Sequence, residues 1–175
     1  MSYKEKRVLN SYFLRAGYNY KEKYYLSFSG RVDGSSVFST NNKYAFFPSV
    51  GASWRIIEED FMKTSSFSDL KLRTSYGLTG NQAINPYGSL SRLGSFNYVS
   101  GNTQVSGTAP TTLGNSDLKW ERTLQTNIGV DFALFADKLY GTVDYYSKTT
   151  KDLLQAFVIP PSSGFTSITK NIRSI

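Results

Sequence analysis

The sequence predicts an all-β fold of long antiparallel strands, and three observations support this prediction. Apolar and polar residues alternate along most of the chain, which is the period of a β-strand. Each alternating run holds about ten residues, against about 5–6 for a typical strand and roughly 9–11 for one that crosses a bilayer. The connections between the runs are alternately short and long. Together these features are typical of an up-and-down transmembrane β-barrel.

Six runs carry the alternation, and each is expected to form one strand. They are residues 11–20, 24–33, 46–56, 70–79, 124–132 and 139–146. No long segment carries the 3.6-residue period of a helix. The pattern therefore predicts a sheet without helices packed on it.

The two faces of these strands differ in chemistry. One face is apolar and is expected to meet lipid; it includes Leu26, Val50, Leu78, Ile128 and Val143. The other face carries Phe47 among Arg, Asn, Ser, Gly and Asp residues and is expected to line a wet lumen. The lumen-facing candidates are Arg15, Lys71, Arg73, Asn127, Asp131 and Asp144.

The connections sort into two kinds. "YKEKY" and "FADKL" turn the chain within about three residues, whereas 33–43 takes about a dozen and 80–119 about 40, as in barrels with short periplasmic turns and long outer loops. The connection 57–69 falls on the short side, and 58–62 is expected to form one helical turn. Aromatic residues crowd the tight-turn ends, as in the girdle at a lipid–water boundary; they are Tyr18, Tyr20, Tyr24, Tyr25, Trp54, Phe132, Phe135 and Tyr140.

Composition narrows the chemistry. The 175 residues contain no Cys and no His, which excludes disulfides, Cys/His zinc sites, thiol nucleophiles and histidine bases. The formal charge is +7, which favours anionic partners only if the charges share one face. The first twenty residues carry no secretory signal pattern, and no run approaches the roughly 18 apolar residues of a membrane-spanning helix.

Six strands do not close a barrel. Single-chain barrels begin at about eight strands, and an open edge in lipid leaves backbone groups unpaired at several kcal/mol each. The sequence is therefore expected to be an open segment of a larger barrel.

Several strings of residues are similar to one family. "NYKEKYYLSFSGRVDGSSVFSTNNKYAFFPSVGASWRIIEEDFMK", "FSDLKLRTSYGLTGNQ", "NSDLKWE" and "VDYYSKTTKDLL" resemble the barrel of SusC/RagA-type TonB-dependent outer-membrane transporters. The resemblance covers nearly the whole chain in the family's order. The motif residues are Arg31, Asp33, Gly34, Ser35, Ser36, Pro48, Trp54, Arg55, Gly80, Asn81, Gln82 and Trp120.

The resemblance implies a function and a place. It implies that residues 1–175 are part of a barrel domain of about 22 strands with a plugged lumen, without the plug domain, the signal peptide and the remaining strands. It further implies import of nutrients such as oligosaccharides or peptides across the outer membrane of a Gram-negative cell. The implied partners are a SusD-like surface lipoprotein, outer-membrane lipid, small nutrient cargo and, through the missing N-terminal part, the TonB complex. No enzyme activity, cofactor or nucleic-acid partner is implied.

Each candidate residue also has a purely structural interpretation. The motif 31–36 reads as a strand end with a turn rather than a cargo contact, and 80–82 as a turn leaving the barrel rather than a sugar site. The lumen cations, with Arg31 and Arg55 among them, could pair with Asp131 and Asp144, with a plug or with anionic cargo. Aromatic residues in the long segment, Tyr87, Phe96 and Tyr98, could stack on sugars or pack within the loop.

No catalytic, cofactor-binding or metal-binding residue is predicted. The densest acidic cluster is 58–60, but glycoside hydrolysis needs two carboxyl groups facing each other across a cleft. Two other classes stay open at this point. One is a soluble basic β-barrel that binds single-stranded nucleic acid through aromatic and basic residues, and the other is a small lipocalin-like ligand binder.

Overall fold

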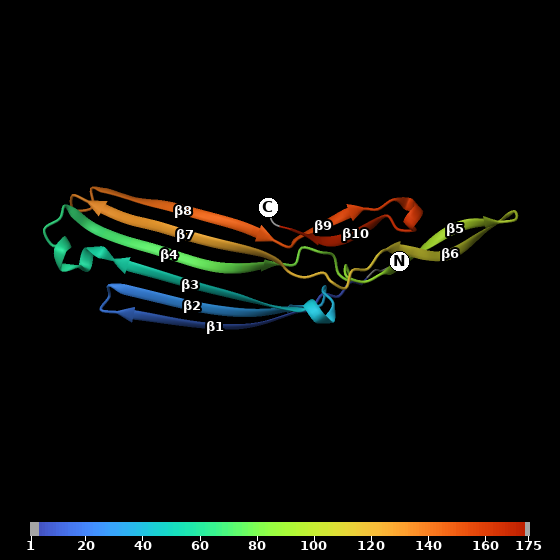
Figure 1. The fold of residues 1–175 in the computed structure, drawn as a ribbon, viewed down its shortest axis with the longest axis horizontal. Helices are drawn as coiled ribbons and strands as arrows, with labels where there is room; N and C mark the ends of the chain where they lie inside the picture. The colour runs from blue at the N-terminus through green and yellow to red at the C-terminus, as the bar shows by residue number, and fades with distance from the viewer. Residues whose placement is uncertain (1–3, 174–175) are drawn as a thin grey trace.

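The computed structural model describes residues 4–173, and one antiparallel six-stranded sheet dominates it (Figure 1). The strand order is β1-β2-β3-β4-β7-β8. The strands are β1 (Leu9–Tyr20), β2 (Tyr24–Ser35), β3 (Tyr44–Arg55), β4 (Phe67–Asn81), β7 (Glu121–Leu134) and β8 (Leu139–Lys151). All six predicted strands are confirmed, and at 12 to 15 residues they are longer than the alternating runs. These lengths exceed what a tilted strand needs to cross a bilayer.

Two hairpins lie outside this sheet. They are β5 (Arg92–Ser100) with β6 (Thr103–Thr112), and β9 (Leu153–Val158) with β10 (Ser167–Ile172). The prediction that 80–119 is a long loop is therefore incomplete, because most of it forms the β5–β6 hairpin. Its alternation is weak, since Gly, Ser and Thr occupy positions on both of its faces.

The remaining elements are short 3₁₀ turns: η1 (Thr40–Asn42), η2 (Ile56–Glu58), η3 (Asp60–Met62) and η4 (Pro161–Ser163). The single helical turn expected at 58–62 is thus two 3₁₀ turns that meet at Glu59. Between residues 4 and 173, no helix has the length and apolar character needed to cross a membrane.

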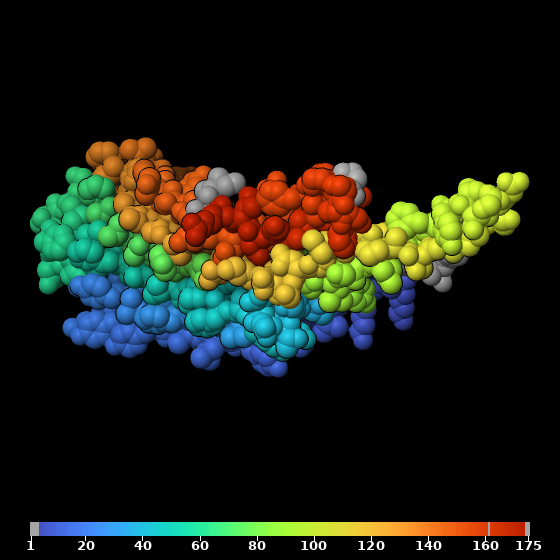
Figure 2. Space-filling model, turned by 45° about the vertical axis from the view of Figure 1, so that its right-hand side comes forward, coloured from blue at the N-terminus to red at the C-terminus, as the bar shows by residue number. Residues whose placement is uncertain are grey.

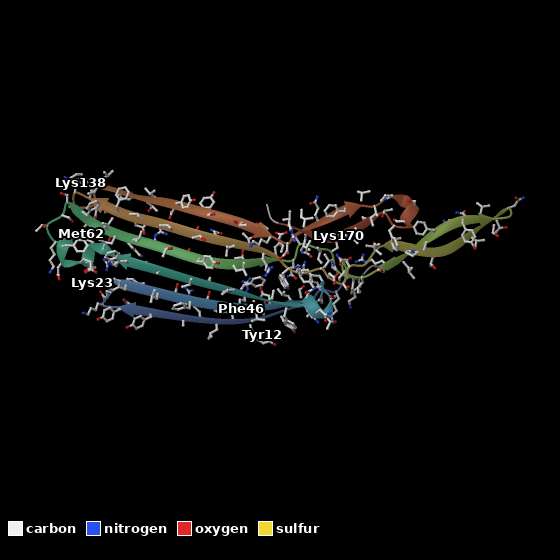
Figure 3. All side chains as sticks on the ribbon, viewed as in Figure 1. Tyr12, Lys23, Phe46, Met62, Lys138 and Lys170 are labelled. Carbon is white, nitrogen blue, oxygen red and sulfur yellow. The ribbon has the colours of Figure 1, made fainter. Side chains whose placement is uncertain are left out.

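The two ends of the sheet are unlike each other. At one end the β1–β2 and β7–β8 turns and the η2–η3 connection hold the strands together, and Figure 3 places Lys23, Met62 and Lys138 there. The hairpins β5–β6 and β9–β10 extend from the opposite end (Figure 1). We call these the tight-turn end and the long-loop end. This division agrees with the predicted loop lengths.

The apolar face of the sheet is exposed rather than packed. Leu26 pairs in register with Ala52, and Thr74 pairs with Ile128 on the same face. Leu26, Val50, Ile128 and Val143 are 40%, 37%, 47% and 65% exposed. Farther toward the long-loop end, Tyr12 and Phe46 extend this face (Figure 3). A soluble core would bury these side chains, so their exposure agrees with a surface that meets lipid.

The sheet does not close. Within residues 4–173, β1 and β8 are its two edges, and each pairs with one neighbour only. The predicted open segment is confirmed, and a closed lipocalin-like barrel is not formed.

A small hydrophobic core lies at the long-loop end. It consists of Val37, Phe38, Phe47, Leu118 and Trp120, with Ala45, Leu78, Ile84 and Leu154 packed against it. Pairing between β3 and β4 ends at Ser49–Gly77, so the two strands separate beyond that point. Phe47 and Leu78 were predicted on opposite faces, one toward the lumen and one toward lipid. That prediction is wrong here, because both side chains contribute to one cluster where the strands diverge.

Candidate functional site

The polar face of the sheet is hollowed into an open groove of about 520 Å³. Its floor follows one row of paired residues: Ser27 lies opposite Gly51, Gly51 opposite Ser75, and Ser75 opposite Asn127. Because these side chains are small, the groove is open across four strands. Three of the predicted lumen-facing residues, Arg73, Asn127 and Asp144, line it.

Arg73 is the centre of an ion-pair network in this groove. Its Nε and one terminal nitrogen donate to Asp131 at 2.7 and 2.9 Å, and the same terminal nitrogen donates to Asp144 at 3.1 Å. Gly129 lies between Arg73 and Asp144 in the register, and a Cβ there would collide with both side chains. Thr142 also donates to Asp131 at 3.1 Å. The predicted pairing of lumen cations with Asp131 and Asp144 is therefore present for Arg73.

Asn127 is held by neighbours on the same face. It accepts a hydrogen bond from Gln125 at 3.0 Å and donates one to Ser75 at 3.0 Å. Closer to the long-loop end on the same face, the hydroxyls of Ser29 and Ser49 lie 2.7 Å apart. The polar face of the sheet thus presents neutral hydroxyl and amide groups, which can form hydrogen bonds with peptide or sugar groups alike.

Two of the predicted lumen-facing cations lie outside the ion-pair network of Arg73. Arg15 is exposed on β1, and Lys71 lies opposite Asp131 in the register. Neither forms a salt bridge with another residue in the span 4–173. Both are positive charges on the predicted lumen face that form no salt bridge among residues 4–173.

The motif 31–36 has a structural role. Nε of Arg31 donates to Asp33 at 2.8 Å, and Asp33 is 5% exposed. Ser35 is fully buried, and Ser36 exchanges two hydrogen bonds with Val8 at 2.9 and 3.0 Å. Gly34 leaves room for the ring of Tyr44. These contacts agree with the predicted strand end and turn.

Two further motif residues lie where β3 leaves its neighbour. Pro48 pairs with Gly30 of β2 but has no partner in β4. Proline is tolerated here because β3 has no hydrogen-bonded partner on its β4 side at this position, so the missing backbone N–H interrupts no pairing with β4. Trp120 fills the core and donates from its indole nitrogen to the carbonyl of Lys43 at 3.1 Å.

The segment 80–82 was interpreted as a turn leaving the barrel, and this is wrong for its first two residues. Gly80 and Asn81 still belong to β4 and pair with Arg122 and Glu121. The side chain of Asn81 also donates to Glu121 at 3.1 Å. Only Gln82 lies beyond the strand, where its carbonyl accepts a hydrogen bond from Arg7 at 3.1 Å.

Sequence reasoning missed two residues that organise the long-loop end. Glu121 accepts from the backbone N–H of Leu154 at 3.1 Å. The side chain of Asn171 accepts a hydrogen bond from the backbone N–H of Lys119 at 3.0 Å. It also donates one to the backbone carbonyl of Lys119 at 2.8 Å. These partners are 33 and 52 positions apart, so no local pattern could have identified them.

At the tight-turn end, the carboxylate of Glu59 accepts hydrogen bonds from three side chains. Tyr24 donates at 2.7 Å, Trp54 at 3.1 Å and Lys23 at 3.3 Å. The hydrogen bond from Tyr24, followed by that from Trp54, holds the pKa of Glu59 below its ordinary value. The rings of Tyr24 and Trp54 stack at 6.2 Å, within the predicted aromatic girdle.

The neighbouring carboxylates of the acidic cluster are also paired. Glu58 binds Arg55 at 2.9 Å and Asp60 binds Lys63 at 2.6 Å. Across residues 4–173, no three acidic side chains gather in a way that could hold a metal ion. The cluster therefore anchors the connection between β3 and β4.

Comparison with known protein families shows which family this sheet, apolar on one face and polar on the other, belongs to. The model of the TonB dependent receptor-like β-barrel matches residues 2–174. The chain belongs to the TonB-dependent receptor family. Members are β-barrel proteins of the cell outer membrane, and this TonB-dependent receptor segment is a multi-pass β-structure of that membrane.

Individual receptors agree with this assignment. A TonB-dependent receptor of Formosa agariphila is 44% identical over 94% of this chain, and the TonB-dependent receptor SusC of Bacteroides thetaiotaomicron is 38% identical over 99% of it. The chain spans only 17% and 18% of these two relatives. Both relatives are TonB-dependent receptors.

Solved structures give the same fold. The RagAB peptide importer matches with TM-scores of 0.85 in its 'closed-closed' state and 0.84 in its 'open-open' state, at 37% and 36% identity. These matches cover 95% and 96% of this TonB-dependent receptor segment and 18% of the importer chain. The siderophore receptor PirA of Pseudomonas aeruginosa, at 15% identity and a TM-score of 0.61, shares the fold.

Proposed function

We propose that the chain is part of the single barrel domain of an outer-membrane transporter that imports small nutrients such as oligosaccharides or peptides. The observation that carries this proposal is the chemistry of the six-stranded sheet. It has exposed apolar side chains on one face and a groove lined by hydroxyl and amide groups on the other. Groups of this kind bond to the backbone of peptides and to the hydroxyls of sugars. The likeness to a peptide importer supports the peptide alternative, and the likeness to SusC supports membership of the same transporter class.

We propose two protein partners for the complete transporter. A SusD-like surface lipoprotein caps the barrel at the long-loop end, and the TonB complex supplies energy from the periplasmic side. A plug domain fills the lumen, and its carboxylates pair with the free cations Arg15 and Lys71. The basic balance of the chain, +7, favours such acidic contacts.

The proposal is tested in cells that carry the full-length transporter. Uptake of labelled peptides and of labelled oligosaccharides is measured in wild-type cells, in a deletion strain, and after the proton-motive force is dissipated. We expect uptake of one cargo class to be lost in the deletion strain and after dissipation. Uptake that persists in both conditions would contradict the proposed function.

A further inference from the structure

Arg31 presents part of its guanidinium group on the polar face of the sheet. It lies on β2 on the same face as Asn127, and its side chain is 46% exposed. Its Nε donates to Asp33 at 2.8 Å, whereas its terminal nitrogens form no hydrogen bond or salt bridge with any residue between 4 and 173. Arginine carries N–H donors on Nε and on both terminal nitrogens, so those on the terminal nitrogens remain for another group.

A buried carboxylate fixes one side of this guanidinium group. Asp33 is 5% exposed, and its Oδ2 accepts the hydrogen bond from Arg31. Its other oxygen, Oδ1, is buried and has no hydrogen-bond partner within residues 4–173. A buried carboxylate that loses its cation is left uncompensated, which is strongly unfavourable. Asp33 therefore keeps Arg31 in place without occupying its terminal nitrogens.

An aromatic ring positions the guanidinium group from a second side. The guanidinium carbon of Arg31 lies 5.8 Å from the centre of the Phe47 ring, a distance at which the ring face attracts a cation. Phe47 is itself buried against Trp120, whose indole nitrogen donates to the carbonyl of Lys43. The chain near Trp120 therefore lies against the β2–β3 connection, gold beside cyan in Figure 2. Because this core holds the ring, the guanidinium group is positioned before any ligand binds.

The neighbours of Arg31 on this face offer apolar and hydroxyl groups. Arg31 pairs in register with Phe13 of β1, whose ring is 66% exposed. Ser29 precedes Arg31 on the same face and shares a hydrogen bond with Ser49. None of the residues of β1 and β3 that pair with positions 29, 31 and 33 is acidic. The sheet therefore supplies no anion for the terminal nitrogens of Arg31.

A carboxylate fits these terminal nitrogens. A guanidinium group binds a carboxylate through two parallel hydrogen bonds. The positive charge of Arg31 is already shared with Asp33, so it suits a single negative charge better than the roughly two charges of a phosphate monoester.

We propose that Arg31 binds the carboxylate of an acidic cargo, either a peptide C-terminus or an acidic sugar, and that Phe13 packs against the cargo beside it. This inference rests on the proposed function and narrows the cargo to nutrients that carry a carboxylate. The proposed plug contacts, Arg15 and Lys71, lie nearer the tight-turn end of the sheet. Arg31 is therefore left on the cargo side of them.

Arginine footprinting of the wild-type protein tests the site without a substitution. Full-length transporter in native outer membranes is treated with phenylglyoxal, which modifies accessible guanidinium groups, and mass spectrometry measures the modification at each arginine. Four probes are compared: short peptides without Asp or Glu that end in a free carboxylate, the same peptides as C-terminal amides, oligogalacturonides, and their methyl esters. We expect one carboxylate probe to slow modification of Arg31 at least about fivefold and its neutral counterpart to have no effect.

Arg15 is the matched control, because it lies on the same face one residue pair away. Its modification is expected to be the same with and without each probe. Protection of Arg31 by the peptides assigns the site to a C-terminal carboxylate, and protection by the oligogalacturonides assigns it to an acidic sugar. The inference is overturned if Arg31 is unreactive without a probe, if charged and neutral probes protect it equally, or if none protects it.

A conservative variant separates a carboxylate site from a purely structural arginine. Arg31→Lys keeps a positive charge beside Asp33 but lacks the planar pair of terminal nitrogens. Equilibrium dialysis with purified full-length transporter is expected to show about tenfold weaker binding of the protecting probe and unchanged binding of its neutral counterpart. Arg15→Lys should change neither, and heat-resistant migration in detergent gels checks the fold of both variants. Equal affinity of Arg31→Lys and wild type for the carboxylate probe would overturn the inference.

Uptake of the same probes distinguishes this inference from the proposed function. We expect wild-type cells to take up the protecting probe at least about fivefold faster than its neutral counterpart. Equal uptake of the two, lost in the deletion strain, would overturn the inference and leave the function intact. Absence of energised uptake for all four probes would overturn both.

Discussion

The ring of Phe47 occupies the space where a side chain on Gly80 would lie. Phe47 belongs to β3 and Gly80 to β4, and the two strands are no longer paired at this height. The contact closes the gap with a packed aromatic ring, backed by Trp120 at 5.5 Å between ring centres. A glycine in the motif 80–82 is thus required by packing rather than by a turn.

Replacing this glycine should destabilise the long-loop end. Gly80→Ala places a methyl group against the Phe47 ring, and we expect a loss of about 1–3 kcal/mol in the free energy of unfolding. Gly17→Ala is the control, because the nearest atom to its new Cβ is 3.9 Å away. Urea unfolding of the full-length transporter in detergent measures both variants. Equal stability of the two would contradict the packing assignment.

The Arg73–Asp131 pair should contribute modestly to stability. Both side chains are about one-third exposed, at 38% and 30%, so solvent weakens their attraction. A double-mutant cycle with Arg73→Met and Asp131→Asn is expected to give a coupling of roughly 0.5–1 kcal/mol. Pairing Arg15→Met with Asp131→Asn provides the control cycle. A coupling in the control as large as in the test cycle would refute a direct contact.

The tight-turn end should depend on pH through Glu59. Its pKa is lowered in the folded state, so its contribution to stability is complete above the ordinary glutamate pKa and is lost as pH falls through the folded-state value. Glu59→Gln removes this dependence, since an amide keeps hydrogen bonds but does not titrate in this range. Unfolding curves from neutral pH to pH 3 compare the variant with the wild type. The difference between them should shrink at acidic pH, and a constant difference would exclude the role of ionised Glu59.

Local patterns predicted the fold well where strands are paired on both sides. Alternation of residues such as Asn127 and Ile128 identified the faces of β7, because each side chain follows its backbone position. The same rule failed at Phe47 and Leu78, where β3 and β4 separate and both side chains turn into one core. Alternation carries no information about where two strands part.

The site was predicted in part for the same reason. Arg73, Asn127 and Asp144 reach the groove because they share the polar face of adjacent strands. Which cation pairs with which carboxylate depends on the register between neighbouring strands. Gly129 lies between Arg73 and Asp144 in that register, and because it has no side chain, the guanidinium of Arg73 can reach Asp144. Contacts of Glu121 and Asn171 join distant segments of the long-loop end and leave no periodic signal.

Accessibility of successive residues in β7 tests the central claim most directly. The 175 residues contain no cysteine. Single cysteines at 123 through 128 are introduced into a full-length transporter from which any other cysteine has been removed, and they are spin-labelled in native outer membranes. We expect labels at Thr123, Gln125 and Asn127 to collide with a water-soluble relaxation agent, and labels at Leu124, Thr126 and Ile128 to collide with lipid-dissolved oxygen. Accessibility that does not alternate along these six positions would contradict a wall with lipid on one side and a wet lumen on the other.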